Sequence, residues 1–393
     1  MIGDLKHYGL IHVYKSRMKI GSLLLLTALI LGLFRSPAPA QDNVPSRAMA
    51  TAQLLAGIQP ASGDPVIDRF AALDCWKEHR QWMEGQWAQV RARIGAMEQW
   101  RAQEVRLYDA PARSLIYPFS GPDFLNAYEM APDHARYVFF SLERPGALPD
   151  LSTFTGGQFK QLLQDVRGAF RDIFERNYFI TDFMTKQLAT PQLSGTVPIM
   201  ATMMALLDLK IVRVENYDLF PEQTRAYDKP AAIRPRKLMR GARIEFVNSK
   251  SGKTQQLYYF SLDVSDKALE FYPGFLDWVG RQRPATAFLK SASYLLHDAQ
   301  FSKTRDMLLA SADTIIQDDT GIPYRFLTRS PWHVRIYGRY TKPLKALNYG
   351  YQPDLEVAYQ KIQETPPLAF PFGYHWRTQR SGIMVAVREL KTN

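Results

Sequence analysis

The chain of 393 residues contains one cysteine, Cys75. A single cysteine excludes an internal disulfide framework and any metal centre built from several thiolates. We find no internal repeat, no low-complexity tract and, beyond residue 34, no apolar run long enough to cross a bilayer. Hydrophobic residues make up 46% of the chain and charged residues 22%, which excludes a disordered polymer and a long coiled coil.

The first 40 residues have the pattern of a secretory signal peptide. Basic residues precede an apolar run, Ile20–Phe34, and Ala38-Pro39-Ala40 supplies the small residues of a cleavage site before Gln41. The run is short for a membrane span, so a cleaved leader is expected, with an uncleaved anchor as the alternative. We therefore predict a periplasmic or secreted protein.

The positive charge of the chain is modest once the leader is set aside. The whole chain carries a net charge of +11, and the first 40 residues hold five basic side chains and one acidic one, which leaves +7 for the rest. An exported protein meets no chromosomal DNA, so anionic envelope surfaces or polymers are better expected partners than nucleic acid. Six basic residues and no acid lie within Lys229–Arg243. We interpret this segment as a solvated loop, with an anion-binding patch as the alternative.

The N-terminal part of the mature chain is expected to be a linker followed by a helical extension. Residues 41–65 are weakly periodic and rich in small residues, which is typical of a linker. Within the extension, residues 66–110, the apolar side chains from Met83 to Met97 recur at helical spacing and include Trp87. This tryptophan-rich stripe is most simply core, and a partner-docking surface is the alternative.

From residue 111 to 393, short apolar runs alternate with helical patterns. Strands alternating with helices predict a layered α/β fold, a sheet covered by helices. The segments Arg243–Val247 and Gln256–Leu262 flank a turn-rich link and predict an antiparallel hairpin, so the sheet should be mixed. With no long polar linker in this region, one mixed α/β domain is the simplest prediction.

Polar chemistry is concentrated first in Tyr117–Phe124, YPFSGPDF, between a short strand and a predicted helix. Ligands usually bind where strands end in such a sheet, which makes Tyr117, Ser120 and Asp123 candidate ligand-binding residues. A rigid turn that caps the next helix is the alternative interpretation. The segment is not a Gly-x-Ser-x-Gly elbow, so it does not indicate a hydrolase serine.

The second concentration is Gln317–Phe326, QDDTGIPYRF, which also follows an apolar strand. Two adjacent carboxylates repel each other, and a raised pKa on one of them would suit general acid or base chemistry. Asp318, Asp319 and Arg325 are therefore candidate catalytic residues, and Tyr324 a candidate ligand contact. The alternative is a capped turn with one carboxylate in water. Glu143 follows a further predicted strand and joins the ligand-binding candidates.

No cofactor and no metal site are predicted. His297, His333 and His375 are dispersed, and no pair has a short ligand spacing such as His-x-x-x-His. Each is expected to be an ordinary core or surface histidine.

Several strings resemble a family of bacterial exported proteins of uncharacterised activity. They are the two segments above together with SLERPGALPDL at Ser141–Leu151, LKSASYLLH at Leu289–His297 and YQPDLEVAY at Tyr351–Tyr359. The resemblance spans most of the mature chain. It implies export and a single architecture, and it carries no catalytic assignment.

These observations lead to one main hypothesis and two alternatives. The main hypothesis is an envelope protein whose polar cleft at strand ends binds a hydroxylated or charged small molecule or polymer end. The first alternative is a periplasmic hydrolase with Asp318 or Asp319 as base and Arg325 as anion clamp. The second is a structural protein that docks a partner through the tryptophan-rich helix. The predicted cleft is lined by Tyr117, Ser120, Asp123, Glu143, Asp318, Asp319, Tyr324 and Arg325.

Overall fold

A computed structural model of the chain describes residues 46–61, 63–105, 113–179, 184, 186–219, 238–362, 365–375 and 378–389. The expected leader, residues 1–40, and most of the basic segment that begins at Lys229 lie outside the described residues.

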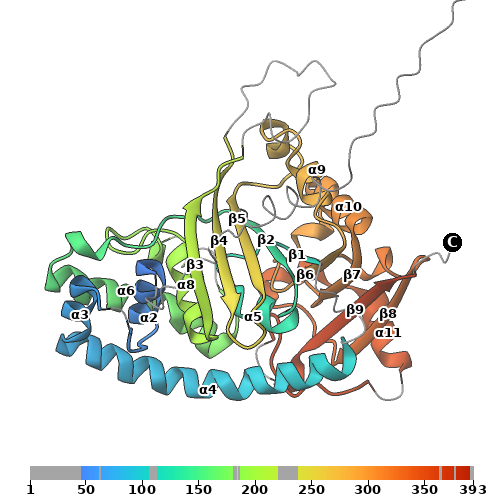
Figure 1. Cartoon of the computed structure of the whole chain (residues 1–393). Helices are drawn as coiled ribbons and strands as arrows, with labels where there is room; N and C mark the ends of the chain where they lie inside the picture. The colour runs from blue at the N-terminus through green and yellow to red at the C-terminus, as the bar shows by residue number, and fades with distance from the viewer. Residues whose placement is uncertain are drawn as a thin grey trace, which may run out of the picture. The chain divides into compact units, whose positions relative to one another are not determined.

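The described residues form a nine-stranded mixed sheet, which confirms the predicted α/β class (Figure 1). Its strand order is β3-β4-β5-β2-β1-β6-β7-β9-β8, and the five central strands, from β5 to β7, run parallel. The outer pairs on both sides are antiparallel. The strands are β1 Ser114–Pro118, β2 Arg136–Ser141, β3 Leu209–Asn216, β4 Arg240–Asn248, β5 Thr254–Ser261, β6 Ala285–Leu289, β7 Ala312–Gln317, β8 Trp332–Gly338 and β9 Gly382–Arg388.

The predicted hairpin is confirmed as β4 and β5. Val247 pairs with Thr254 and Gly241 with Phe260 in an antiparallel register. The side chain of Asn248 closes the turn, because its oxygen accepts hydrogen bonds from the backbone N–H groups of Lys250 and Ser251 at 2.8 and 3.1 Å.

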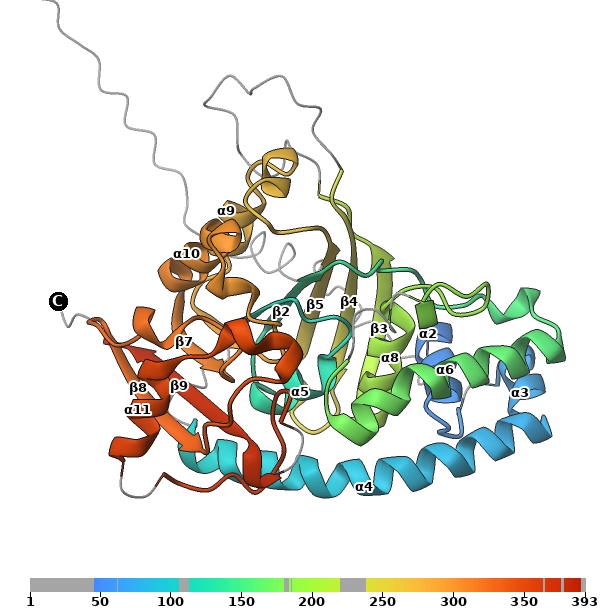
Figure 2. The ribbon, with the colours of Figure 1, turned by 180° about the vertical axis from the view of Figure 1, so that it is seen from behind.

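Helices cover both faces of the sheet, so the central strands are buried on both sides (Figures 1 and 2). In β1, Leu115 and Tyr117 pack into one hydrophobic core and Ile116 into the other. The larger core lies under α2 Arg47–Leu55, α3 Pro65–Ala71, α4 Asp74–Glu104, α5 Phe124–Met130, α6 Gly156–Arg176 and α8 Val197–Leu206. The smaller core lies under α9 Phe275–Gly280 and α10 Ser302–Ser311, and α11 Pro353–Lys361 packs beside β8 and β9.

The linker expected over 41–65 differs from the structure, which has a buried helix there. In α2, the side chains of Leu54 and Leu55 are fully buried, and the helix packs against α8 and β3. Its many small residues conceal the helical period, but they let the helix approach its neighbours closely. The N-terminal helices therefore belong to the main core and are not a separate extension.

The long helix α4 runs across the whole width of the sheet, on the face that the larger core covers (Figure 1). Near its start, the indole N–H of Trp76 donates to the Leu54 carbonyl at 3.0 Å, and near its end Trp100 packs edge-to-face on Tyr337 of β8 at 5.2 Å. Along the stripe, Met83 and Met97 are buried. Trp87 is half-buried, with its ring 6.4 Å from that of Phe174, so most of the stripe belongs to the core.

Among the helices that the structure describes, none combines the length and the apolar character needed to cross a bilayer.

Candidate functional site

A pocket lies where the chain changes direction in the sheet. From β1 the chain continues to β2 on one side, and only after β5 does it cross to β6 on the other side of β1. The carboxyl ends of strands at such a switch point are the usual ligand site of open α/β sheets. The cavity has a volume of about 330 Å³ and is bounded by the segments that follow β1, β2, β5 and β6. We call it the switch-point pocket. Its polar lining is Tyr117, Ser120, Asp123, Ser141, Glu143, Asp263, Lys290, Ser291, Ser293 and Tyr374.

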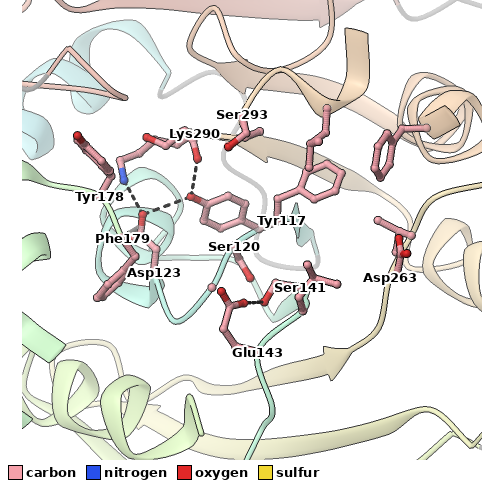
Figure 3. Close-up of a pocket in the computed structure, with 18 of the residues that line it drawn as sticks. Tyr117, Ser120, Asp123, Ser141, Glu143, Tyr178, Phe179, Asp263, Lys290 and Ser293 are labelled. Carbon is pink, nitrogen blue, oxygen red and sulfur yellow. Dashed lines mark hydrogen bonds and ion pairs between the residues drawn. The ribbon is translucent and has the colours of Figure 1, made fainter. Parts of the chain in front are cut away.

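The turn after β1 holds a buried hydroxyl in a strained backbone. Phe119 has a φ of 57° and Gly121 a φ of 51°, and Ser120 lies between them with 4% of its surface exposed. Only glycine adopts such angles without strain, and strained residues cluster at functional sites. The Ser120 Oγ has no hydrogen-bond partner among the described residues, although nearly all buried polar groups have one. Figure 3 shows this side chain among the pocket residues.

The next residues of this segment supply one half of a buried ion pair. Asp123 caps α5, since one carboxylate oxygen accepts from the backbone and side-chain N–H groups of Asn126 at 3.2 and 2.8 Å. The other oxygen lies 2.6 Å from the Nζ of Lys290, and the Tyr117 hydroxyl is 3.3 Å away (Figure 3). Both charged side chains are almost fully buried, at 1% exposure for Lys290 and 3% for Asp123. The helix-cap interpretation and the site interpretation of Asp123 are therefore compatible.

Burial changes the proton affinities of this cluster. Desolvation lowers the pKa of Lys290, and the neighbouring Asp123 and Asp318 carboxylates oppose that change. Desolvation also raises the pKa of Tyr117 well above its usual value, and the Asp123 charge adds to the effect. The Tyr117 hydroxyl is therefore a neutral hydrogen-bonding group.

The loop after β6 forms the opposite wall and is also strained. Ser291, Ser293 and Tyr294 have φ values between 51° and 57°. The buried Oγ of Ser291 has no hydrogen-bond partner in the described part of the chain. Two strained turns thus bring two unpartnered hydroxyls to one cavity.

The QDDTG segment holds this second loop in place. An oxygen of Asp318 accepts the backbone N–H of Ser291 at 2.9 Å, and the Thr320 hydroxyl accepts that of Ala292 at 2.7 Å. The other Asp318 oxygen accepts hydrogen bonds from the backbone and hydroxyl of Thr320. A side chain at Gly373 would approach Asp318 to 2.1 Å, so the chain must pass close to it there. Asp318 is therefore a buttress of the pocket wall.

The predicted cleft residues separate into two groups. Tyr117, Ser120, Asp123 and Glu143 line the switch-point pocket. The other four predicted residues, Asp318, Asp319, Tyr324 and Arg325, do not line it. The two segments do meet, but through the loop after β6.

Each of these four residues is engaged elsewhere. Asp319 accepts the Tyr294 hydroxyl at 2.5 Å, and burial together with the charge of Asp318 raises its pKa to about 7. The backbone N–H of Tyr324 donates to a Gln352 side chain at 2.7 Å, and the Arg325 guanidinium lies over the Phe326 ring. The base and clamp of the hydrolase alternative, Asp318 or Asp319 and Arg325, therefore do not line the switch-point pocket.

Sequence reasoning did not select several residues of the pocket. Lys290 and Ser291 follow β6 directly, so the strand-end rule that identified Ser120 would also have identified them. Tyr374 reaches the pocket from a loop, where its hydroxyl lies 2.6 Å from Ser293 Oγ. No local pattern points to such a long-range contact.

Comparison of the chain with models of protein families, with curated proteins and with solved structures found no match.

Proposed function

We propose that this is an exported protein that binds a small hydroxylated ligand in the switch-point pocket. The observation that carries the proposal is the pair of buried hydroxyls, Ser120 Oγ and Ser291 Oγ, which line one cavity without partners among the described residues. A buried polar group without a hydrogen bond costs about 1–3 kcal/mol. A bound ligand with hydroxyl groups would supply the missing bonds, since hydroxyls both donate and accept.

The size and lining of the pocket support the same class of ligand. A volume of about 330 Å³ is at the small end of ligand sites. The aromatic side chains of Phe119, Tyr178, Phe179 and Phe301 share the lining with the polar groups. A compact ligand with both hydroxyls and an apolar ring face, such as a single sugar, matches this mixture better than a long polymer.

Export is proposed from the first 40 residues and from the family that the chain resembles. The apolar run Ile20–Phe34 and the Ala38-Pro39-Ala40 pattern support a cleaved leader. N-terminal sequencing of the protein recovered from the periplasm or medium of an expressing bacterium should begin at Gln41. Recovery of full-length chain from the cytoplasm would contradict this part of the proposal.

The binding proposal is tested by thermal-shift measurements on the purified protein with neutral sugars, amino sugars, sugar acids and inorganic phosphate. A hydroxylated compound at about 100 times its Kd should stabilise the fold by about 2.7 kcal/mol and raise the Tm by several degrees. Ser120→Ala should reduce that shift, because the variant removes a hydroxyl that faces the ligand. Ser251→Ala, an exposed serine in the β4–β5 turn, is the matched control and should leave it unchanged.

Two outcomes would contradict binding in this pocket. One is that no hydroxylated compound shifts the Tm. The other is that the shift is the same in the Ser120→Ala variant as in the unaltered protein.

A further inference from the structure

The charges around the switch-point pocket fall into two groups, and the inner group is balanced. Asp123 and Lys290 form the buried ion pair, and Asp318 and Arg93 are close enough to act on them electrostatically. Two acids and two bases thus neutralise one another. Among the residues that line the cavity, the charges of Asp123 and Lys290 therefore offset each other.

The outer group contains Glu143, an acid without a basic partner among the described residues, which lies two residues beyond the end of β2. Its side chain lines the pocket, and only 7% of the residue is exposed. One carboxylate oxygen accepts the Ser141 hydroxyl at 2.5 Å (Figure 3). Within the described residues, no basic side chain forms an ion pair with Glu143, and its second carboxylate oxygen accepts no hydrogen bond.

The position of Glu143 is fixed by its neighbours. The Tyr259 hydroxyl of β5 donates to the Glu143 backbone carbonyl at 2.9 Å and lies 2.7 Å from Ser141 Oγ. These bonds hold the carboxylate in place against the cavity. A carboxylate that has no counter-charge attracts a cation more strongly in a partly enclosed cavity than in water.

The mouth of the pocket carries a second negative charge, in addition to that of Glu143. Asp263 follows β5, is exposed, and lines the cavity on this side. With the inner cluster neutral, Glu143 and Asp263 make the described lining negative. The Phe119 and Phe301 rings, 5.8 Å apart edge-to-face, border the same cavity, and aromatic ring faces attract cations.

We propose that the ligand of this pocket carries an amine, whose ammonium group pairs with Glu143 while its hydroxyl groups bond to Ser120 and Ser291. The ligand class is a hydroxylated amine of about the size of one amino sugar. This inference rests on the proposed function, because it specifies the charge of the ligand of the same pocket.

The test compares three sugars that differ mainly in charge, by isothermal titration calorimetry on the purified protein at neutral pH. Glucosamine should bind at least about tenfold more tightly than glucose, and glucuronate should bind most weakly. This comparison needs no variant, so it stands even if a substitution in the pocket prevents folding.

The role of Glu143 is tested by Glu143→Gln, which removes the charge and keeps the shape. Glucosamine affinity should fall by about tenfold or more, while glucose affinity should stay within about twofold. Glu78→Gln is the matched control, because Glu78 is an exposed acid on α4 that does not line the pocket, and it should leave glucosamine affinity unchanged.

The outcomes separate this inference from the proposed function. Equal binding of glucosamine and glucose, or equal loss of both in Glu143→Gln, would overturn the amine assignment while sugar binding that depends on Ser120 still stood. Tighter binding of glucuronate would overturn it as well. Absence of binding by all three sugars would count against both proposals.

Discussion

The buried ion pair between Lys290 and Asp123 allows a sharp test of the site. The Nζ–Oδ2 distance is 2.6 Å, and the side chains are 1% and 3% exposed. Lys290→Met keeps the volume of the side chain and removes its charge. The Asp123 carboxylate then keeps only the Asn126 and Tyr117 hydrogen bonds, with 3% of its side chain exposed. We expect the free energy of unfolding to fall by about 3–5 kcal/mol, the usual cost of leaving one partner of a buried pair alone.

The assay is urea unfolding followed by tryptophan fluorescence at pH 7. A double variant, Lys290→Met with Asp123→Asn, should lose less than the sum of the two single variants, with a coupling of about 1–3 kcal/mol. Lys253→Met is the matched control: Lys253 lies 3.1 Å from Asp133, but the two side chains are 43% and 42% exposed. It should cost no more than about 1 kcal/mol. A cost below about 1 kcal/mol for Lys290→Met, or additive single effects, would refute a desolvated pair at this position.

Three further predictions test the surroundings of the pocket and the fold. Burial and the charge of Asp318 raise the pKa of Asp319 from its ordinary value of 3.8 to about 7 in the folded state, so its contribution to stability is complete at low pH and is lost as the pH rises through 7. Relative to Asp319→Asn, the protein should lose up to about 1.4 kcal/mol per pH unit between pH 5 and 7 in urea titrations. Gly373→Ala should lower the Tm by several degrees, because Gly373 has a φ of 67° and a Cβ there would meet Asp318; an unchanged Tm would contradict the close approach. Leu54→Ala should cost about 2–5 kcal/mol in urea unfolding if α2 belongs to the core, and almost nothing if residues 41–65 form a linker.

Local sequence patterns predicted most strands but not their order. The β4–β5 hairpin could be predicted because both strands and their turn are adjacent in sequence. The position of β9 between β7 and β8 depends on pairing across about fifty residues, as in the contact of Ile336 with Met384. Nothing in either strand specifies that partner. The positions of the strands can therefore be predicted from short stretches of this sequence, whereas the order of the strands in the sheet cannot.

The candidate site could be predicted as far as the edge of the sheet but not as far as the direction of each side chain. The strand-end rule placed Ser120 and Asp318 at the same edge, and both are there. Both acids bind the β6 loop and do not line the cavity: Asp318 accepts the backbone N–H of Ser291, and Asp319 accepts the hydroxyl of Tyr294. Asp318 accepts a hydrogen bond from the backbone N–H of Ser291, which is 27 residues away in the sequence. The sequence alone does not reveal such a contact.

The support of the β6 loop has a consequence for how the protein matures. The loop carries Lys290 and Ser291, but Asp318, Thr320 and the close passage at Gly373 come later in the chain. During synthesis with the N-terminus first, the switch-point pocket is completed only when the last quarter of the polypeptide has emerged. A product truncated after α10, at Ser311, would retain all the lining residues except Tyr374 and would still lack the support that Asp318 and Thr320 give to the β6 loop.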